Sequence, residues 1–160
     1  MENEKLFYSY DQIHALIKQG SHKVMEDNFN PDLILAIGGG GFIPGRILRT
    51  YINASIVSLT MNFYNDKEEI QDKPNIEQMI DKSIVAGKRV LIVDEVDDTR
   101  KTLAFLLDYF AENGYEFEKL GIFVVHNKIK PKSYTFNGAV KYYSCVEVED
   151  KWVVYPWDRI

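Results

Sequence analysis

The chain has 160 residues, 46% of them apolar, which is enough to build one domain with a sizeable core. Its formal net charge of −5 and its lack of a Lys/Arg-rich stretch argue against a dedicated nucleic-acid-binding protein. No apolar run approaches membrane-spanning length, and the first residues contain no apolar signal region, so we expect a soluble, cytoplasmic protein with no membrane partner.

The N-terminal part of the chain predicts a helix followed by a strand. Ser9 and Gln12 have the spacing of a capping box, which predicts that a helix begins there. The apolar positions of this helix are Ile13, Leu16 and Ile17. Pro31 then interrupts the chain, and the apolar run 33–37 predicts the first central strand.

Four consecutive glycines follow this strand: Gly38, Gly39, Gly40 and Gly41. Their spacing does not fit G-x-G-x-x-G, and G-x-x-x-x-G-K-[ST] is absent, so neither a dinucleotide fingerprint nor a P-loop is present. Because glycines let backbone N–H groups converge on an oxyanion, the loop suits pyrophosphate. A purely structural turn is the alternative. A helical pattern over residues 42–48 comes next.

The middle of the chain continues the alternation of strands and helices. Residues 52–59 predict another strand, so we expect an α/β fold with a parallel central sheet flanked by helices. Residues 62–83 are rich in Asn, Asp, Glu, Gln and Lys. A polar excursion of about 20 residues inside a domain is more often functional than a linker, so we expect a mobile active-site loop there, with a solvated linker as the alternative.

Residues 90–102 are the most informative segment. The run 90–93 predicts a buried parallel strand, so the carboxylates of Asp94, Glu95 and Asp98 emerge at its carboxyl end, where open α/β sheets bind ligands. Residues 99–102 then start a helix, whose free N–H groups suit a phosphate. An acidic turn before a capped helix is the alternative. Crowded carboxylates repel one another unless a cation or hydroxyl groups are bound, which favours the ligand site.

This segment resembles the 5-phosphoribosyl-1-pyrophosphate (PRPP) motif of the type I phosphoribosyltransferases. The resemblance implies that Asp94 and Glu95 bind the ribose hydroxyls and that Asp98 faces N7 of a purine base. It also implies a 5′-phosphate loop, made of Asp98, Thr99, Arg100, Lys101 and Thr102. The family usually has Gly where this chain has Arg100. We therefore expect a slightly different loop path, with the guanidinium joining the phosphate contacts.

The resemblance extends to two earlier loops. In this family the first loop, matching Gly38 to Gly41, binds the pyrophosphate of PRPP and often contains a cis peptide bond between non-proline residues. Related enzymes often carry Arg or Lys near the position of Gly39, so pyrophosphate binding here would depend on amides or on Arg46. The family also has a flexible catalytic loop at the position of residues 62–83. Many such loops contain a Ser-Tyr pair, which is absent from this chain. Tyr64 is the candidate to substitute for it.

The last part of the chain, residues 126–160, resembles the small purine-binding hood of the xanthine, guanine and hypoxanthine phosphoribosyltransferases. The resemblance implies that Trp152 stacks on the purine and that the backbone of Val153 reads its edge. It assigns donation to O6 to Lys128, with Lys130 as second choice, and places Asp158 near Mg²⁺. Cationic donation disfavours adenine, which has no acceptor at that position. Taken alone, the tryptophans could equally be core aromatics.

The resemblance spans nearly all of residues 1–160 and implies a 6-oxopurine phosphoribosyltransferase in a single domain. Its substrates would be PRPP and a purine base. Mg²⁺ would be the cofactor, with Asp94, Glu95 and Asp158 as ligands, and the enzyme would be a homo-oligomer, either a dimer or a tetramer. A nucleotide-sensing regulatory protein on the same fold and a pyrimidine (orotate) enzyme are the alternatives. The sequence leaves the choice among xanthine, guanine and hypoxanthine open.

Overall fold

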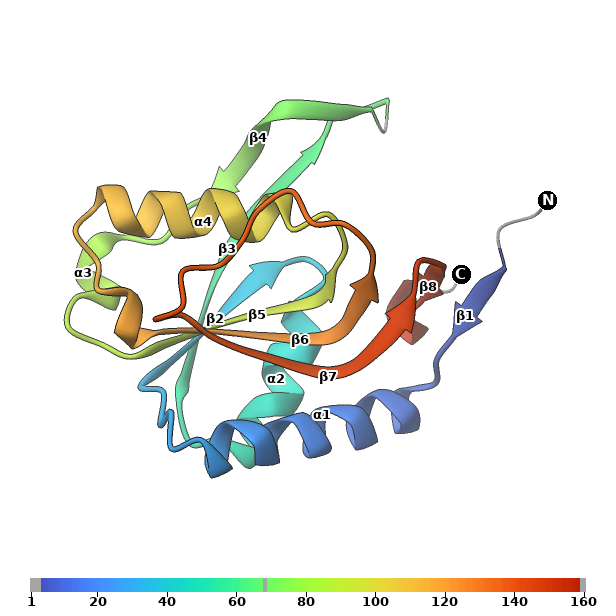
Figure 1. Cartoon of the computed structure of the whole chain (residues 1–160), viewed down its shortest axis with the longest axis horizontal. Coiled ribbons are helices and arrows are strands. Elements are labelled where there is room, and N and C mark those ends of the chain that lie inside the picture. Colours follow the sequence, from blue (N-terminus) through green and yellow to red (C-terminus); the bar gives the residue numbers. More distant parts are fainter. Residues whose placement is uncertain (1–3, 68, 159–160) are drawn as a thin grey trace.

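The computed structural model describes residues 4–67 and 69–158 (Figure 1). The elements in chain order are β1 (Lys5–Phe7), α1 (Tyr10–Glu26), β2 (Leu33–Gly38), α2 (Phe42–Tyr51), β3 (Ser55–Tyr64), β4 (Ile70–Gln78), α3 (Lys82–Val85), β5 (Val90–Asp97), α4 (Lys101–Glu112), β6 (Leu120–Ile129), β7 (Lys141–Glu149) and β8 (Trp152–Val154). Two short 3₁₀ helices cover Phe117–Lys119 and Pro156–Asp158.

The main sheet has the strand order β4-β3-β2-β5-β6-β7. All neighbouring pairs are parallel except β3 and β4, which run antiparallel. The expected α/β fold with a parallel central sheet is therefore confirmed. The carboxyl ends of β2, β5 and β6 face the same side, on the right in Figure 1, so the loops that follow these strands meet there.

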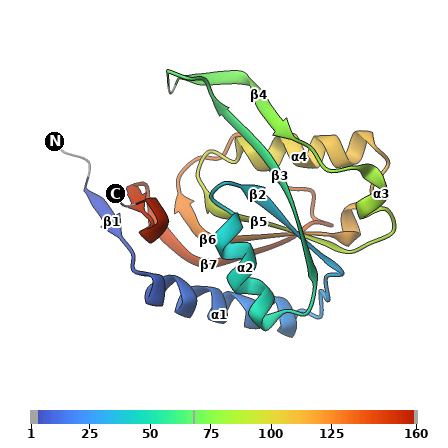
Figure 2. The ribbon, with the colours of Figure 1, turned by 180° about the vertical axis from the view of Figure 1, so that it is seen from behind.

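Helices cover both faces of this sheet, with α3 and α4 on one face and α1 and α2 on the other (Figures 1 and 2). Side chains of β2 and of residues 90–93 in β5 alternate between the two cores, which explains why these segments are apolar throughout. Leu35 and Ile92 pack toward α4, whereas Ile34 and Leu91 pack toward α1 and α2. The buried residues of α4 are Leu103, Leu106, Leu107 and Phe110.

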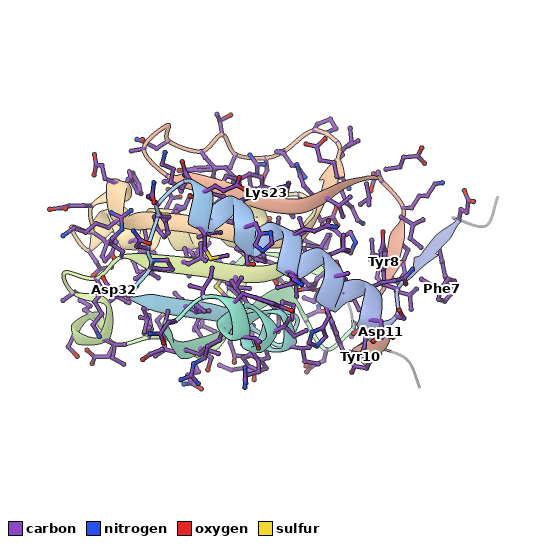
Figure 3. All side chains as sticks on the ribbon, turned by 90° about the horizontal axis from the view of Figure 1, so that it is seen from below. Phe7, Tyr8, Tyr10, Asp11, Lys23 and Asp32 are labelled. Carbon is purple, nitrogen blue, oxygen red and sulfur yellow. The ribbon has the colours of Figure 1, made fainter. Side chains whose placement is uncertain are left out.

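The capping box predicted for the first helix is present. Ser9 Oγ accepts a hydrogen bond from the N–H of Gln12, and Gln12 Oε1 accepts one from the N–H of Ser9. Figure 3 shows α1 lying along its face of the molecule, with Tyr10 and Asp11 at its start and Lys23 near its end. Lys23 Nζ donates to the carbonyl oxygen of Ser144 at 2.7 Å, which ties the end of α1 to β7.

Residues 62–83, where a mobile active-site loop is expected, contain the end of β3 and the whole of β4. Strand β3 runs from Ser55 to Tyr64, beyond the predicted 52–59, and pairs with β4 as a hairpin that projects from the body (Figure 1). Its turn is closed by Asn65, whose Oδ1 accepts hydrogen bonds from the N–H groups of Lys67 and Glu69. Strand β4 could not be predicted from the sequence, because it is exposed along nearly its whole length and carries no alternation of apolar residues.

The C-terminal strand β8 pairs in parallel with β1 rather than with the main sheet. Leu6 lies opposite Val153, and the N–H of Tyr8 donates to the carbonyl oxygen of Val154 at 3.1 Å. The sequence analysis missed β1, so the predicted hood is built from both ends of the chain, as Figures 1 and 3 show. Among the described residues, no helix is both long enough and apolar enough to span a membrane.

Candidate active site

The glycine loop and the tip of β5 lie against each other. A Cβ atom on Gly40 would lie 1.8 Å from Glu95 Oε2, and one on Gly41 would lie 2.4 Å from the carbonyl oxygen of Val93. Glycine is therefore required at both positions, because any side chain would displace the neighbouring strand or its carboxylate. The peptide bond between Gly38 and Gly39 is cis, as the resemblance implied. The two predicted ligand loops thus form one surface.

Asp94 and Glu95 follow the buried part of β5 and are both partly buried. Burial raises the pKa of Asp94 well above its usual value, and the negative charge of Glu95 raises it further. Glu95 Oε2 is buried and has no hydrogen-bond partner among the described residues. Two repelling carboxylates with an unpartnered oxygen suit a divalent cation that prefers oxygen ligands.

Asp158, the third predicted metal ligand, lies in the 3₁₀ helix after β8. Burial raises the pKa of the Tyr155 hydroxyl, and the charges of Glu95, Asp94 and Asp158 raise it further. All three carboxylates are therefore within electrostatic reach of one hydroxyl. Within residues 4–67 and 69–158, no three His, Cys, Asp or Glu side chains form a ready metal cage. A Mg²⁺ ion here would need further oxygen ligands from substrate and water, as this ion commonly does.

The predicted phosphate loop begins α4. Arg100 precedes the first helical residue and has φ 73°, a left-handed conformation. Its guanidinium is directed to Asp97, with Nη2 2.9 Å from Asp97 Oδ2, and not to the front of the loop as expected. The ammonium of Lys101 also turns away, because Nζ donates to the carbonyl oxygen of Gln71 in the hairpin at 2.8 Å. Backbone N–H groups and the hydroxyls of Thr99 and Thr102 are left as candidate phosphate donors.

Two lysines of the C-terminal part lie beside Asp98. Lys128 Nζ is 3.7 Å from Asp98 Oδ2, and Lys130 Nζ donates to Asp98 Oδ1 at 2.7 Å. Both lysines also face Asp150, at 3.8 Å and 3.1 Å. Burial alone would raise the pKa of Asp98, but the hydrogen bond from Lys130 and the charges of the lysines outweigh it and hold that pKa below its usual value. Asp98 is therefore ionised at neutral pH. Lys128 lies within β6, one residue before the end of that strand.

The aromatic residues of the hood have two different environments. Trp152 is 65% exposed, so it is not a core residue and its face is available to a ligand. Trp157 stacks on Tyr155, with ring centroids 4.7 Å apart. The Tyr155 hydroxyl donates to the carbonyl oxygen of Glu95 at 3.1 Å, which ties the hood to the acidic tip of β5. Arg46, the alternative pyrophosphate cation, extends along α2 with Nη1 3.4 Å from Thr50 Oγ1.

The comparison with known proteins identifies the family. Residues 9–159 match the model of the phosphoribosyl transferase domain. The chain belongs to the phosphoribosyltransferase family. It is 38% identical to the hypoxanthine-guanine phosphoribosyltransferase of Schizosaccharomyces pombe, over 99% of this chain and 91% of that protein. It is 35% identical to xanthine phosphoribosyltransferase 1 of Saccharomyces cerevisiae, over 98% of this chain and 91% of that protein.

A solved structure agrees with these relatives. A hypothetical protein from Neisseria gonorrhoeae with bound ppGpp is 34% identical to this phosphoribosyltransferase and has a TM-score of 0.87. The alignment covers 100% of this chain and 92% of that chain. The sequence similarity and the structural similarity therefore extend over the whole fold.

Sequence reasoning missed four side chains of this phosphoribosyltransferase site: Asp97, His126, Lys132 and Tyr155. Asp97 and His126 are buried in the neighbouring strands β5 and β6. His126 Nδ1 is 2.8 Å from the Tyr155 hydroxyl, and burial lowers the pKa of His126 to about 4. Because Tyr155 donates to Glu95, the neutral imidazole must donate to Tyr155. The signal for His126 was a polar residue directly after the apolar run 122–125, and Asp97 stood in the acidic run 94–98, which does not tell which carboxylate is buried.

Proposed function

We propose that this chain transfers the 5-phosphoribosyl group from PRPP to a 6-oxopurine base and releases pyrophosphate. The substrate base would be xanthine, guanine or hypoxanthine. Residues 1–160 would form one catalytic domain with a purine hood over about 126–160. We also propose that the enzyme works in the cytoplasm as a homo-oligomer.

The proximity of Lys128 to Asp98 is the observation that carries this proposal. In a purine, O6 and N7 lie on the same edge of the ring system. A 6-oxopurine therefore offers an acceptor for an ammonium beside a nitrogen whose proton a carboxylate can accept. Lys128 Nζ and Asp98 Oδ2, 3.7 Å apart, present that donor and that acceptor side by side. Adenine would place an amino group against Lys128, so we propose that it is rejected.

Each remaining group has a task in the proposed transfer. Asp94 and Glu95 would hold the ribose hydroxyls and stabilise the positive charge that develops on the ring as the bond from C1′ to pyrophosphate breaks. Asp98 would accept the N7 proton while N9 bonds to C1′. Trp152 would stack on the base. Mg²⁺, held by Asp94, Glu95 and Asp158 together with PRPP oxygens, would neutralise the leaving pyrophosphate.

The glycine loop supports the pyrophosphate end of the proposed reaction. The space between Gly40 and Glu95 has no room for a side chain on the glycine. A ligand bound there would therefore contact the backbone amides and the carboxylates of Asp94 and Glu95 directly. The curated relatives are named as purine phosphoribosyltransferases and give no support to the regulatory alternative. The ppGpp bound by the Neisseria protein also joins a guanine base to pyrophosphate groups, which is the ligand chemistry proposed for this chain.

The test is a PRPP-dependent assay with Mg²⁺ and each of xanthine, guanine, hypoxanthine and adenine. We expect turnover with at least one 6-oxopurine, none with adenine, and loss of turnover when EDTA removes the metal. Asp98→Asn should lower kcat by at least ~100-fold, the low end for loss of a general acid–base group. Turnover on adenine alone, or an Asp98→Asn variant as active as the wild type, would contradict the proposal.

A further inference from the structure

Arg100 occupies a conformation that an L-residue normally avoids. Its φ of 73° lies in the left-handed region, where the Cβ atom crowds the following carbonyl oxygen. Glycine would adopt this conformation without a Cβ penalty. Other interactions must therefore stabilise this conformation of Arg100. The contacts of its own side chain supply them.

The guanidinium of Arg100 is bound by a carboxylate and by an aromatic ring. Its Nε and Nη2 lie 3.1 Å and 2.9 Å from Asp97 Oδ2, and its centre lies 3.9 Å above the ring of Phe136. The hydroxyl of Tyr142 donates to the same carboxylate oxygen at 2.7 Å. Asp97 is only 1% exposed, so its charge is neutralised inside the protein and not by solvent. A forked, planar cation meets both the carboxylate and the aromatic face, which the point charge of a lysine would not do.

Residues 130–136, here called the strap, hold the loop from the same side. Lys132 Nζ donates to the carbonyl oxygens of Asp97 and Asp98 at 2.8 Å and 2.9 Å. Ser133 donates to the carbonyl oxygen of Thr99 from both its N–H and its hydroxyl, at 3.0 Å and 2.8 Å. The carbonyls of three consecutive residues are therefore fixed against the strap.

Fixing these carbonyls also fixes the amides of the next residues. In a trans peptide unit the C=O of one residue and the N–H of the next point in opposite directions. The N–H groups of Asp98, Thr99 and Arg100 are therefore directed away from the strap, at the start of α4. Convergent backbone amides at the beginning of a helix are the groups that bind a phosphate.

We propose that Arg100 is a positioning residue that acts through Asp97 to hold the 5′-phosphate loop in its binding conformation. This inference rests on the proposed function, since it assigns the loop to the phosphate of PRPP. Arg100 does not contact that phosphate. Where related sequences usually use the freedom of glycine, this chain uses a buried ion pair and a stacked aromatic ring. The contacts that hold the loop come from the protein itself, so affinity for PRPP depends on a side chain directed away from the phosphate.

The test is steady-state kinetics on Arg100→Gly, Arg100→Lys, Asp97→Asn and the double variant Arg100→Gly/Asp97→Asn. We expect KM for PRPP to rise about tenfold in Arg100→Gly, the equivalent of about 1.4 kcal/mol. The KM for the purine base and kcat should change much less. Arg100→Lys should resemble Arg100→Gly, because lysine keeps the charge and loses the fork. Arg49→Ala, an exposed arginine at the end of α2, is the matched control.

The double variant distinguishes positioning from direct phosphate contact. If Arg100 acts through Asp97, Asp97→Asn raises KM for PRPP by a similar factor and the double variant is no worse than either single one. If Arg100 contacts the phosphate, Asp97→Asn frees it and leaves KM unchanged or lower, and Arg100→Lys keeps most of the affinity. Either of the latter results would overturn the inference.

Amide hydrogen exchange gives a readout that does not depend on turnover. The amides of residues 98–101 should exchange faster in Arg100→Gly than in the wild type, while those of residues 70–78 in the hairpin stay unchanged. Unchanged exchange at 98–101 would overturn the inference even if the enzyme is active. A wild type that does not use PRPP, with faster exchange in Arg100→Gly, would instead contradict the proposed function and leave the loop mechanism standing. A thermal melt of each variant shows that it is folded.

Discussion

The tip of β5, residues 94–100, and the β3–β4 hairpin have similar polar compositions and opposite environments. Both are rich in acidic residues, yet the Asp97 side chain at the tip is completely buried while nearly all of β4 is exposed. At the tip, Arg100, Lys132 and Tyr142 satisfy the buried carboxylate. In the hairpin, polar groups face water and bond mainly within their own turn. Similar residue types thus form a buried, hydrogen-bonded turn in one place and an exposed arm in the other.

The difference follows from what each region packs against. The tip of β5 lies between the glycine loop and the strap, so any unpartnered charge there would lose its hydration without compensation. Beyond the pairing of β3 with β2, the hairpin contacts the body close to its turn, where Lys101 reaches the carbonyl oxygen of Gln71. We therefore expect substitutions at the tip to cost far more than equivalent substitutions in the hairpin.

The largest effect is expected for Asp97→Ala. Removing one partner of a buried ion pair leaves the guanidinium of Arg100 uncompensated, so the free energy of unfolding should fall by about 3–5 kcal/mol. Glu77→Ala in β4 is the matched control and should change it by less than about 0.5 kcal/mol, because that carboxylate is exposed. Urea unfolding followed by circular dichroism measures both. Equal losses in the two variants would show that burial does not distinguish the regions.

Gly40→Ala tests the contact between the glycine loop and the tip. The added Cβ would overlap the Glu95 carboxylate, and such overpacking costs about 1–3 kcal/mol. If the displacement falls on the proposed PRPP site, kcat/KM for PRPP should drop by about 10- to 100-fold. Gly138→Ala, whose Cβ would meet nothing within 4 Å, is the control. Normal kcat/KM in Gly40→Ala would argue that this loop does not bind the substrate.

Lys130→Met should change the pH dependence of the proposed reaction. Lys130 favours the ionised form of Asp98, so its removal raises the pKa of that carboxyl. Asp98 must be ionised to accept a proton. The activity of the enzyme is therefore lost as the pH falls through the pKa of Asp98. The acidic limb of the profile of kcat/KM against pH should therefore move to higher pH. The control is Lys73→Met, which changes a lysine of the exposed hairpin. The acidic limb should not move in this variant. If it moves as far as in Lys130→Met, the shift is a general effect of charge.

The smallest effect is expected for Lys101→Met, which cuts the contact between α4 and the hairpin. This side chain donates one hydrogen bond to Gln71 and lies 4.9 Å from the ring of Phe63. Because the hydrogen bond is exposed, the free energy of unfolding should fall by less than about 1 kcal/mol. Amide exchange over residues 70–78 should nevertheless accelerate, since local opening becomes easier. Slower exchange, or a loss as large as that of Asp97→Ala, would contradict this comparison.

Much of the fold could be predicted because its signals are local. The capping box at Ser9 and Gln12 is satisfied within one turn, and the apolar runs at 33–37 and 90–93 can be buried only inside a parallel sheet. The hairpin could not be predicted in this way, because its second strand, β4, is exposed and shows no apolar alternation. Strand β1 was missed because three residues carry no periodic signal, and it exists only through its pairing with β8.

The order of residues along the chain determined which chemical groups could meet: glycines and carboxylates at the ends of two central strands, and lysines and a tryptophan near the C-terminus. The tertiary structure decided which way each long side chain turns. Arg100 and Lys101 are adjacent cations at a helix start, and the resemblance implies that both belong to a phosphate-binding loop. One is held instead by a buried carboxylate and the other by a hairpin carbonyl. Those partners are near in space and, for Lys101, 30 residues away along the chain, so only packing could select them.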